Sequence, residues 1–332
     1  RRCPMRKLLE LQANQIEAVL AGHRILARVW GGIVTPRFVR FQLTTPLGVR
    51  VQQVTRLSEE IALALGVPAA RVYRKEGAIQ VELPREEPHP VRLLPLCARL
   101  EEVPELTAVL GVDEEGVPLL VRLSSPEVAH VLVSGTTGSG KTALLRTILF
   151  SLALYNAPSA LQMVLVDVQG RGLLALGGLP HLMVPVVQEV GRAVEVLGRV
   201  VAEMERRDRL GHVRPRLVVA IDELADVLQV GGKGVEEALL RLTQRGRKAG
   251  VHVVGCTQKP TAAVVGSVVK ANFPLRLVGS VVSAEDARVA AGVGGSGAEK
   301  LLGRGDFVLV CKGQVVRFQA AWAGEEEIRE WI

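Results

Sequence analysis

Apolar and polar positions change their period several times over the first hundred residues, so several short elements are expected there. Helical spacing of leucine, isoleucine and valine predicts a helix over residues 6–21, and a Ser-Glu-Glu start predicts another over Ser58–Leu65. The expected strands are residues 25–30 and Phe38–Thr44 around a Gly31-Gly32 turn, and a hairpin over residues 71–83 that turns at Gly77. Prolines and charges over residues 84–95 predict an irregular exit from this small α+β module.

From about Leu106 the pattern becomes short apolar runs that alternate with helical stretches, which is typical of a parallel sheet. The predicted strands are residues 119–123, 131–133, 162–166, 217–221, 251–256, Leu275–Val278 and 307–310. The sequence therefore predicts an α/β domain over residues 101–332, with a mostly parallel central sheet. A small basic α+β module with an N-terminal helix is expected to precede it over residues 1–100.

Composition fits this division and adds a charge asymmetry. With 332 residues, of which 48% are hydrophobic, the chain is long enough for two buried cores. Residues 1–100 carry 16 Lys and Arg against 8 Asp and Glu, whereas residues 101–332 carry 25 against 26. The basic excess favours contact with a polyanion, and a solvated basic surface is an equal alternative.

Other compositional features exclude several classes of protein. The four cysteines are widely spaced and form no C-x-x-C pair, which disfavours a metal site or a disulfide framework and fits a reducing cytoplasm. No apolar run approaches the roughly 18 residues that a bilayer span needs, and no signal peptide is visible. Since the chain begins at Arg1, an upstream membrane anchor is compatible with it. Aromatic residues make up only 3%, which disfavours stacking platforms for single-stranded nucleic acid.

A glycine-rich octapeptide follows the apolar run 130–134 and opens the amphipathic stretch 143–155. Its residues are Gly135, Thr136, Thr137, Gly138, Ser139, Gly140, Lys141 and Thr142. Strand, loop and helix in this order are the context of a P-loop, whose backbone N–H groups cradle phosphates. Lys141 is then expected to reach the β- and γ-phosphates, and the Thr142 hydroxyl to bind Mg²⁺. The octapeptide predicts a site for a nucleoside triphosphate such as ATP.

A second acidic motif stands at the end of the apolar run 217–221. Ligands of open α/β sheets bind at the carboxyl ends of strands, where Asp222 and Glu223 are expected. Asp222 fits the carboxylate that holds Mg²⁺, and Glu223 fits the base that orients and deprotonates the attacking water. The alternative is that the pair caps the following helix. Catalysis is favoured, and an adjacent glutamate is typical of a motor ATPase rather than a small GTPase or a kinase.

Residues 31–331 resemble the motor region of FtsK/SpoIIIE-type double-stranded DNA translocases, without that family's membrane segment or winged-helix γ domain. The strings that carry the resemblance are residues 130–142, 178–182, 222–226, 247–252, 257–260, 270–272 and 298–306. Residues 44–50 and 57–65 resemble the small α module of the same family. The order and spacing of these strings are more specific than a P-loop alone.

The resemblance implies a RecA-like P-loop ATPase that assembles as a homohexameric ring around double-stranded DNA, with ATP between subunits. Arg247 matches the family's Arg-Ala-Ala-Gly position and is the candidate arginine finger, offered to the neighbour's γ-phosphate. Gln258 matches the polar sensor of γ-phosphate. A solvent-facing arginine and an ordinary loop glutamine are the respective alternatives. A membrane anchor or a recognition partner outside this chain is compatible with the resemblance.

The family's phosphate-contacting positions match Lys259, Lys270 and Arg288, which are the candidate DNA-binding residues. Contacts of this kind position a protein on DNA without reading its sequence. Two departures weaken parts of the match. Residues 282–284 are Val-Ser-Ala where the family often has Ser-Ser-Lys, and residues 167–169 are Asp-Val-Gln where it has Asp-Pro-Lys.

Three functions of different class follow. The favoured one is an ATP-driven pump of double-stranded DNA that serves chromosome segregation, conjugative transfer or DNA export. The alternative is a P-loop ATPase of a secretion or protein-remodelling machine. A nucleotide-gated DNA-binding scaffold is disfavoured, because Lys141, Asp222 and Glu223 are all present.

Overall fold

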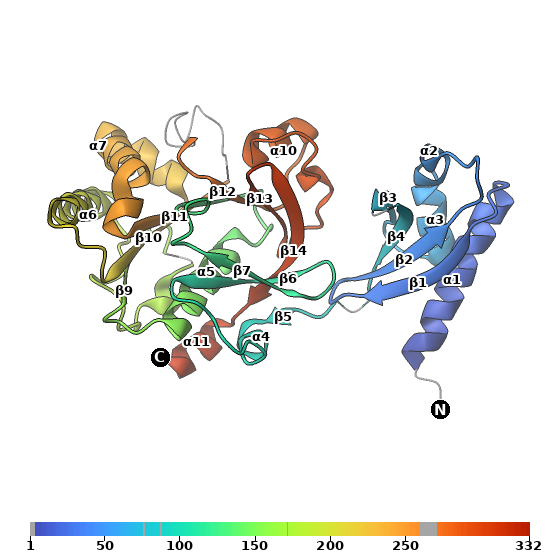
Figure 1. Cartoon of the computed structure of the whole chain (residues 1–332), viewed down its shortest axis with the longest axis horizontal. Helices are drawn as coiled ribbons and strands as arrows, with labels where there is room; N and C mark the ends of the chain where they lie inside the picture. Colours follow the sequence, from blue (N-terminus) through green and yellow to red (C-terminus); the bar gives the residue numbers. More distant parts are fainter. Residues whose placement is uncertain (1–3, 76, 87, 171, 259–270) are drawn as a thin grey trace. The chain divides into compact units, whose positions relative to one another are not determined.

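The computed structural model describes residues 4–75, 77–86, 88–170, 172–258 and 271–332 (Figure 1). The chain divides into two compact units, Arg1–Pro90 and Val91–Ile332. This division falls earlier than the expected boundary after residue 100. The reason is that β5 (Val91–Arg92) pairs with β14 (Gln314–Trp322) of the second unit.

The first unit is an antiparallel sheet of four strands, in the order β1-β2-β4-β3, with helices packed on it. Its elements are α1 (Pro4–Gly22), β1 (Arg28–Val34), β2 (Phe38–Thr44), α2 (Val51–Thr55), α3 (Ser58–Leu65), β3 (Arg71–Lys75) and β4 (Ala78–Pro84). The core joins alternate residues of the strands, such as Phe41 and Val81, to Ile16 and Leu20 of α1 and Ile61 of α3. Strands with a side-chain period of two residues pack against helices with a period of 3.6 residues, and this packing produces the core.

The expected turn at Gly31-Gly32 is wrong. Gly31 and Gly32 lie inside β1, where they pair with Gln42 and Phe41 of β2. The chain reverses after Thr35, whose hydroxyl accepts a hydrogen bond from the Phe38 N–H at 2.9 Å. The backbone N–H of Thr35 donates to the Phe38 carbonyl at 2.8 Å. A proline within this turn fixes φ, and the threonine hydroxyl closes it, so the turn forms without glycine.

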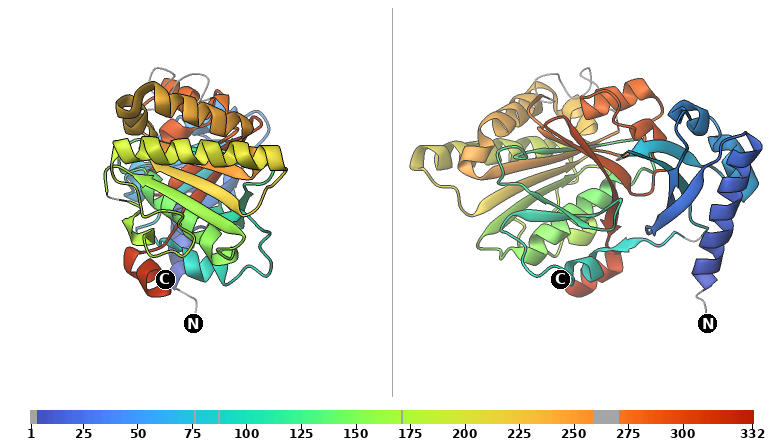
Figure 2. Two further views of the ribbon diagram at one scale, coloured as in Figure 1. Left: turned by 90° about the vertical axis from the view of Figure 1, so that its left-hand side faces the viewer. Right: turned by 45° about the vertical axis from the view of Figure 1, so that its right-hand side comes forward.

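The second unit is built on one large mixed sheet, with the strand order β7-β6-β14-β13-β12-β8-β11-β10-β9 (Figures 1 and 2). The strands from β12 to β9 are parallel, and those from β13 to β7 pair antiparallel with their neighbours. The remaining strands are β6 (Thr107–Asp113), β7 (Pro118–Arg122), β8 (Val131–Ser134), β9 (Leu161–Asp167), β10 (Arg216–Asp222), β11 (Val251–Thr257), β12 (Leu275–Val278) and β13 (Asp306–Cys311). The helices are α4 (Leu93–Cys97), α5 (Lys141–Tyr155), α6 (Val190–Leu210), α7 (Leu224–Arg245), α10 (Ala284–Ala291) and α11 (Glu325–Trp331), with short 3₁₀ turns η1 (Leu174–Leu176), η2 (Gly246–Ala249) and η3 (Ala298–Lys300). The α/β fold with a parallel centre confirms the prediction.

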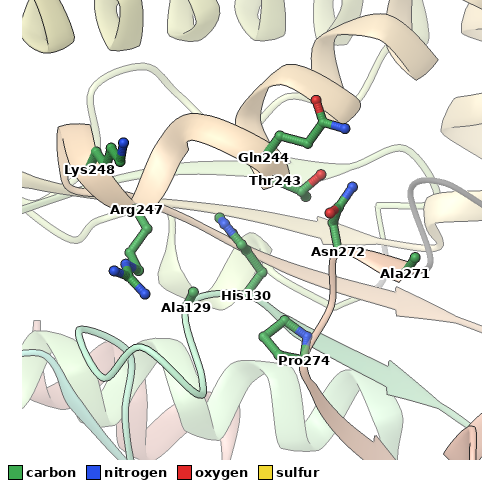
Figure 3. Close-up of a pocket in the computed structure, with 9 residues that line it drawn as sticks. All are labelled: Ala129, His130, Thr243, Gln244, Arg247, Lys248, Ala271, Asn272 and Pro274. Atoms are coloured by element: carbon green, nitrogen blue, oxygen red, sulfur yellow. The ribbon is translucent and has the colours of Figure 1, made fainter.

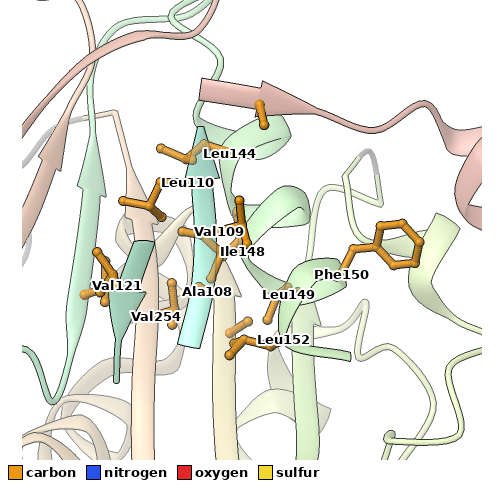
Figure 4. Close-up of a cluster of buried hydrophobic side chains, with 14 of the residues drawn as sticks. Ala108, Val109, Leu110, Val121, Leu144, Ile148, Leu149, Phe150, Leu152 and Val254 are labelled. Carbon is orange, nitrogen blue, oxygen red and sulfur yellow. The ribbon is translucent and has the colours of Figure 1, made fainter. Parts of the chain in front are cut away.

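Helices cover both faces of the parallel strands. Val218 and Ala220 of β10 belong to the core on the α5 side, whereas Leu217, Val219 and Ile221 belong to the core with α6 and α7. On the α5 side, Leu144, Ile148, Leu149 and Leu152 pack against the sheet (Figure 4). Because α5 is buried on most of its surface, the helix is held firmly in place, and so is the backbone of its first residue, Lys141.

The two longest helices of the second unit, α6 and α7, are amphipathic and pack against each other. Their exposed faces carry ion pairs such as Arg245–Asp208 at 2.6 Å. Across the part of the chain that the structure describes, none of the helices is both long enough and apolar enough to cross a membrane.

Candidate nucleotide site

The predicted phosphate loop, acidic pair and sensor lie at one edge of the sheet. Strands β8, β11 and β10 are adjacent and parallel, with Ser134 opposite Thr257 and Ile221 opposite Gly255. The residues that follow these strands therefore emerge at the same carboxyl edge, as expected for a ligand site of an α/β sheet.

Three glycines shape the loop after β8. Gly135, Gly138 and Gly140 have φ values of 148°, 81° and 101°, which side chains rarely adopt. A Cβ atom on Gly135 would lie 2.8 Å from the Ser139 hydroxyl, and one on Gly140 would lie 3.0 Å from the Gly305 nitrogen. Conformation and close packing both require glycine at these two positions.

Lys141 begins α5 and is 8% exposed. Its ammonium donates to the Thr136 carbonyl at 2.9 Å, within the loop itself. Burial lowers the pKa of Lys141, while the nearby carboxylates of Glu223 and Asp222 oppose that shift. A buried ammonium with one protein acceptor is suited to a phosphate oxygen as a second partner.

Thr142 and Asp222 meet directly. The Thr142 hydroxyl donates to the Asp222 carboxylate, with distances of 3.0 and 3.2 Å to its two oxygens. Burial raises the pKa of Asp222 to about 6; the Thr142 hydrogen bond lowers it, and the charges of Asp167 and Glu223 raise it further. A hydroxyl and a crowded carboxylate are hard oxygen donors that fit Mg²⁺, which binds through few protein ligands plus phosphate and water oxygens.

Glu223 has an unusual backbone, with φ of 60° and ψ of 71°. A left-handed glutamate costs on the order of 1–3 kcal/mol, and such strain clusters at functional sites. Glu223 occupies the N-cap position of α7, but its side chain makes no capping hydrogen bond. Instead its Oε1 atom accepts from the Gln258 backbone N–H at 3.3 Å.

Gln258 links the acidic pair to the phosphate loop. Its side-chain carbonyl accepts from the Thr137 hydroxyl at 2.9 Å, while its backbone contacts Glu223. The structure thus brings the predicted sensor, the predicted base and the loop into one hydrogen-bonded set. Their catalytic roles stay predictions.

Arg247 lies at the opposite edge of the sheet, on η2, immediately before β11 begins. Seven residues of β11 separate this turn from Gln258, which at about 3.3 Å per residue is roughly 20 Å. Arg247 therefore lies too far from the phosphate loop of its own chain to contact it. Its exposed guanidinium lines a pocket of about 310 Å³ (Figure 3). The other lining residues are Ala129, His130, Thr243, Gln244, Lys248, Ala271, Asn272 and Pro274.

Two buried histidines, of which His130 also lines this pocket, tie the start of β8 to β11. The Val253 N–H donates to Nδ1 of His130 at 3.0 Å, and Nδ1 of His252 bonds to the Ala129 carbonyl at 2.8 Å. Burial lowers the pKa of His130 to about 3 and that of His252 to about 4. Both rings are therefore neutral at physiological pH and hold the strands together.

The predicted DNA-binding residues are only partly described. Lys259 and Lys270 lie outside the described residues. Arg288 lies on α10 with 63% of its side chain exposed, and its guanidinium bonds to Glu285 at 2.6 and 3.0 Å. Its DNA-binding role stays a prediction.

The structure adds residues that the sequence analysis did not assign to the site. Asp167 ends β9 opposite Asp222 and is 1% exposed. Its Oδ2 atom accepts from the N–H groups of Gly172 and Leu173 at 2.9 and 2.8 Å. A carboxylate at the end of an apolar strand was the available signal, the same signal that identified Asp222. At the position of the family's lysine, the Gln169 amide donates to Asp226 of α7 at 2.9 Å.

This geometry defines the class of the protein. A phosphate loop between β8 and α5, with a strand-terminal Asp-Glu pair beside it, is the nucleotide site of a P-loop ATPase. The FtsK/SpoIIIE family matches residues 98–212 and 208–262, and the FtsK alpha domain matches residues 2–85. The chain belongs to the FtsK/SpoIIIE family.

Similar proteins agree with this assignment. The chain is 32% identical over 355 residues to "DNA translocase FtsK" of Sporosarcina ureae, covering 97% of this chain and 45% of that protein. It is 33% identical over 359 residues to "DNA translocase FtsK" of Staphylococcus aureus (strain Mu50), covering 98% and 45%. The chain thus spans less than half the length of these relatives.

Solved structures share the fold. The pCW3 conjugation coupling protein TcpA, solved with ATPγS, aligns with a TM-score of 0.65 at 17% identity and covers 96% of this chain and 99% of its own. The type VII secretion ATPase EccC of Thermomonospora curvata aligns with a TM-score of 0.62 at 23% identity, covering 72% of this chain and 34% of its own.

Proposed function

We propose that this chain is the motor of an ATP-driven double-stranded DNA translocase. The observation that carries the proposal is the hydrogen-bonded set of Thr137, Gln258 and Glu223. A change at the γ-phosphate reaches Gln258 through this set, and the chain continues from Gln258 toward the predicted DNA-binding lysines. The relatives named DNA translocase support DNA as the substrate.

At the nucleotide, each side chain has a distinct task. Lys141 binds the β- and γ-phosphates, and Thr142 with Asp222 holds Mg²⁺, which neutralises phosphate charge when bound. Glu223 orients a water molecule and accepts its proton, because its carboxylate faces the site rather than capping α7. Gln258 reports whether the γ-phosphate is present.

Arg247 is proposed to complete the site of a neighbouring subunit. It is exposed and lies at the far end of β11 from its own phosphate loop, so it has no role there. A ring of identical subunits, with six as the expected number, would set Arg247 of one subunit against the γ-phosphate held by the next. The pocket around Arg247 offers room for that approach.

Stimulation of ATP hydrolysis by possible substrates tests the proposal. Hydrolysis is measured alone and with duplex DNA, single-stranded DNA, or a panel of unfolded and secreted proteins, with Glu223→Gln as the inactive control. We expect duplex DNA to stimulate most. Stimulation by protein alone would instead support a secretion or remodelling ATPase, and no turnover under any condition would support a nucleotide-gated scaffold.

A further inference from the structure

The backbone of Gly172 lies directly against the predicted metal ligands. A Cβ atom on Gly172 would stand 2.1 Å from Cγ2 of Thr142 and 2.8 Å from Oδ2 of Asp222. Gly172 does not have the positive φ that would itself require glycine. Glycine is needed here because its Cα approaches the Thr142–Asp222 pair too closely for any side chain.

Both the N–H and the carbonyl of Gly172 are hydrogen-bonded, which holds its backbone in this place. Asp167, at the end of β9, accepts hydrogen bonds from the N–H groups of Gly172 and Leu173. On the other side, Nε of Arg146 donates to the Gly172 carbonyl at 3.0 Å. Both Asp167 and Arg146 are buried, at 1% and 9% exposure, so water does not compete freely for these bonds.

Arg146 stands one helical turn after Thr142 on α5, and residues four apart share a helix face. The far end of its guanidinium pairs with Glu325 of α11 at 3.2 Å. Arg146 therefore spans the space between the C-terminal helix and the backbone that rests on the metal ligands. A buried guanidinium requires such a partner, because an uncompensated buried charge is strongly destabilising.

We propose that Arg146 is a positioning residue of the metal end of the nucleotide site. By holding the Gly172 carbonyl, it keeps the Gly172 backbone against Thr142 and Asp222. That contact fixes the hydroxyl and the carboxylate close together, as the pair that would hold Mg²⁺. Glu325 of α11 neutralises Arg146. The proposal rests on the metal-binding role proposed above for Thr142 and Asp222.

The test measures how strongly Mg²⁺ tightens nucleotide binding. A fluorescent ADP analogue is titrated into the full chain in Mg²⁺ and in EDTA. The dissociation constant in EDTA divided by that in Mg²⁺ is the Mg²⁺ ratio. We expect Arg146→Met to reduce this ratio by about tenfold, which equals about 1.4 kcal/mol. Affinity in EDTA should stay close to that of the unchanged protein, because Lys141 and the loop are intact. Arg146→Lys keeps one donor and the charge, so it should recover part of the ratio.

Two further variants approach the same contact from other directions. Gly172→Ala places a methyl group against Thr142 and should reduce the ratio as Arg146→Met does. Glu325→Gln leaves Arg146 in place without its neutralising charge and should give an intermediate ratio. The glycine control is Gly198→Ala, since a Cβ on Gly198 of α6 meets nothing within 4 Å.

Arg207 provides the arginine control. It is 2% exposed, pairs with Glu203 at 2.7 Å and donates to the Pro215 carbonyl at 2.5 Å. Pro215 immediately precedes β10, at the end of that strand opposite to Asp222. Arg207→Met therefore removes a guanidinium that is buried even more deeply than that of Arg146 and has a similar pair of partners, and it should lower stability without changing the Mg²⁺ ratio.

The outcomes separate the two proposals. If Mg²⁺ does not tighten ADP binding in the unchanged protein, the metal role of Thr142 and Asp222 is wrong. If it does, but Arg146→Met keeps the full ratio, the positioning role of Arg146 is overturned. Should Arg146→Met fail to fold, full ratios in both Gly172→Ala and Glu325→Gln would overturn it equally. An equal loss of ratio in Arg207→Met would show a general effect of destabilisation and also overturn it.

Discussion

The ionised Asp222 carboxylate is expected to lower the folding stability of the metal-free protein. Its pKa is raised from the ordinary 3.8 to about 6, first by burial and then by the charges of Asp167 and Glu223. In the unfolded chain the carboxyl ionises near its ordinary pKa, whereas in the metal-free fold it holds its proton to higher pH. Folding stability is therefore lost as the pH rises through this window, and the full penalty is present above about pH 6.

The size of that penalty follows from the shift. Two pKa units correspond to about 3 kcal/mol, at 1.36 kcal/mol for each unit. Asp222→Asn cannot ionise, and its amide oxygen can still accept from Thr142. Without metal at pH 7.5, we expect this variant to be more stable than the unchanged protein by about 1–3 kcal/mol. For a unit of this size, that raises the melting temperature by roughly 2–12 °C.

Thermal unfolding at pH 4.5, 6 and 7.5 measures this effect, in EDTA and in Mg²⁺ with ADP. In EDTA, Asp222→Asn should gain most at pH 7.5 and little at pH 4.5, and it should lose the extra stabilisation that Mg²⁺ gives to the unchanged protein. Asp306→Asn is the contrasting control, because Asp306 is buried but paired with Arg317 at 2.8 Å and should be destabilised by about 1.5–3 kcal/mol. If Asp222→Asn were less stable than the unchanged protein at pH 7.5 in EDTA, the reasoning would be refuted.

Three further predictions concern turnover, assembly and DNA. Lys141→Ala should lose nucleotide binding, whereas Glu223→Gln should bind ATP and retain it, because only water activation is removed; filter binding and single-turnover hydrolysis separate the two. Mixtures of Arg247→Ala and Lys141→Ala subunits should recover part of the activity that each lacks alone, measured as ATP hydrolysis against mixing ratio. Glu285→Gln should release the Arg288 guanidinium, tighten duplex DNA binding and steepen its salt dependence by about 0.9 in log–log slope.

Each of these has a contradicting result. Steady hydrolysis by Glu223→Gln would remove Glu223 from the role of base. Mixed rings that form without any recovery would place Arg247 outside the shared site, or show that turnover needs every interface intact. An unchanged salt slope in Glu285→Gln, with Arg288→Ala as the matched loss of charge, would place Arg288 away from DNA.

The elements that local pattern specifies were predictable. The apolar run Leu275–Val278 forms β12 with those bounds, and Ser58–Leu65 forms α3. The phosphate loop and the Asp222-Glu223 pair stand where the strands before them end. These features depend on residues within about ten positions of one another, which sequence periodicity and glycine spacing report. Strands β6 and β14 of the antiparallel wing were not among the predicted strands, and their order beside β13 depends on pairing between distant segments.

The same distinction explains which contacts of the site were missed. Thr137 and Gln258 are 121 residues apart in sequence, and Arg146 reaches both Gly172 and Glu325. Nothing near Arg146 in the sequence marks it, since an arginine on a helix is ordinarily solvated. Its place becomes meaningful only when the C-terminal helix and the backbone after β9 meet around it. In this protein, the residues predicted to touch nucleotide follow from motifs, whereas those proposed to hold them in place follow from tertiary packing.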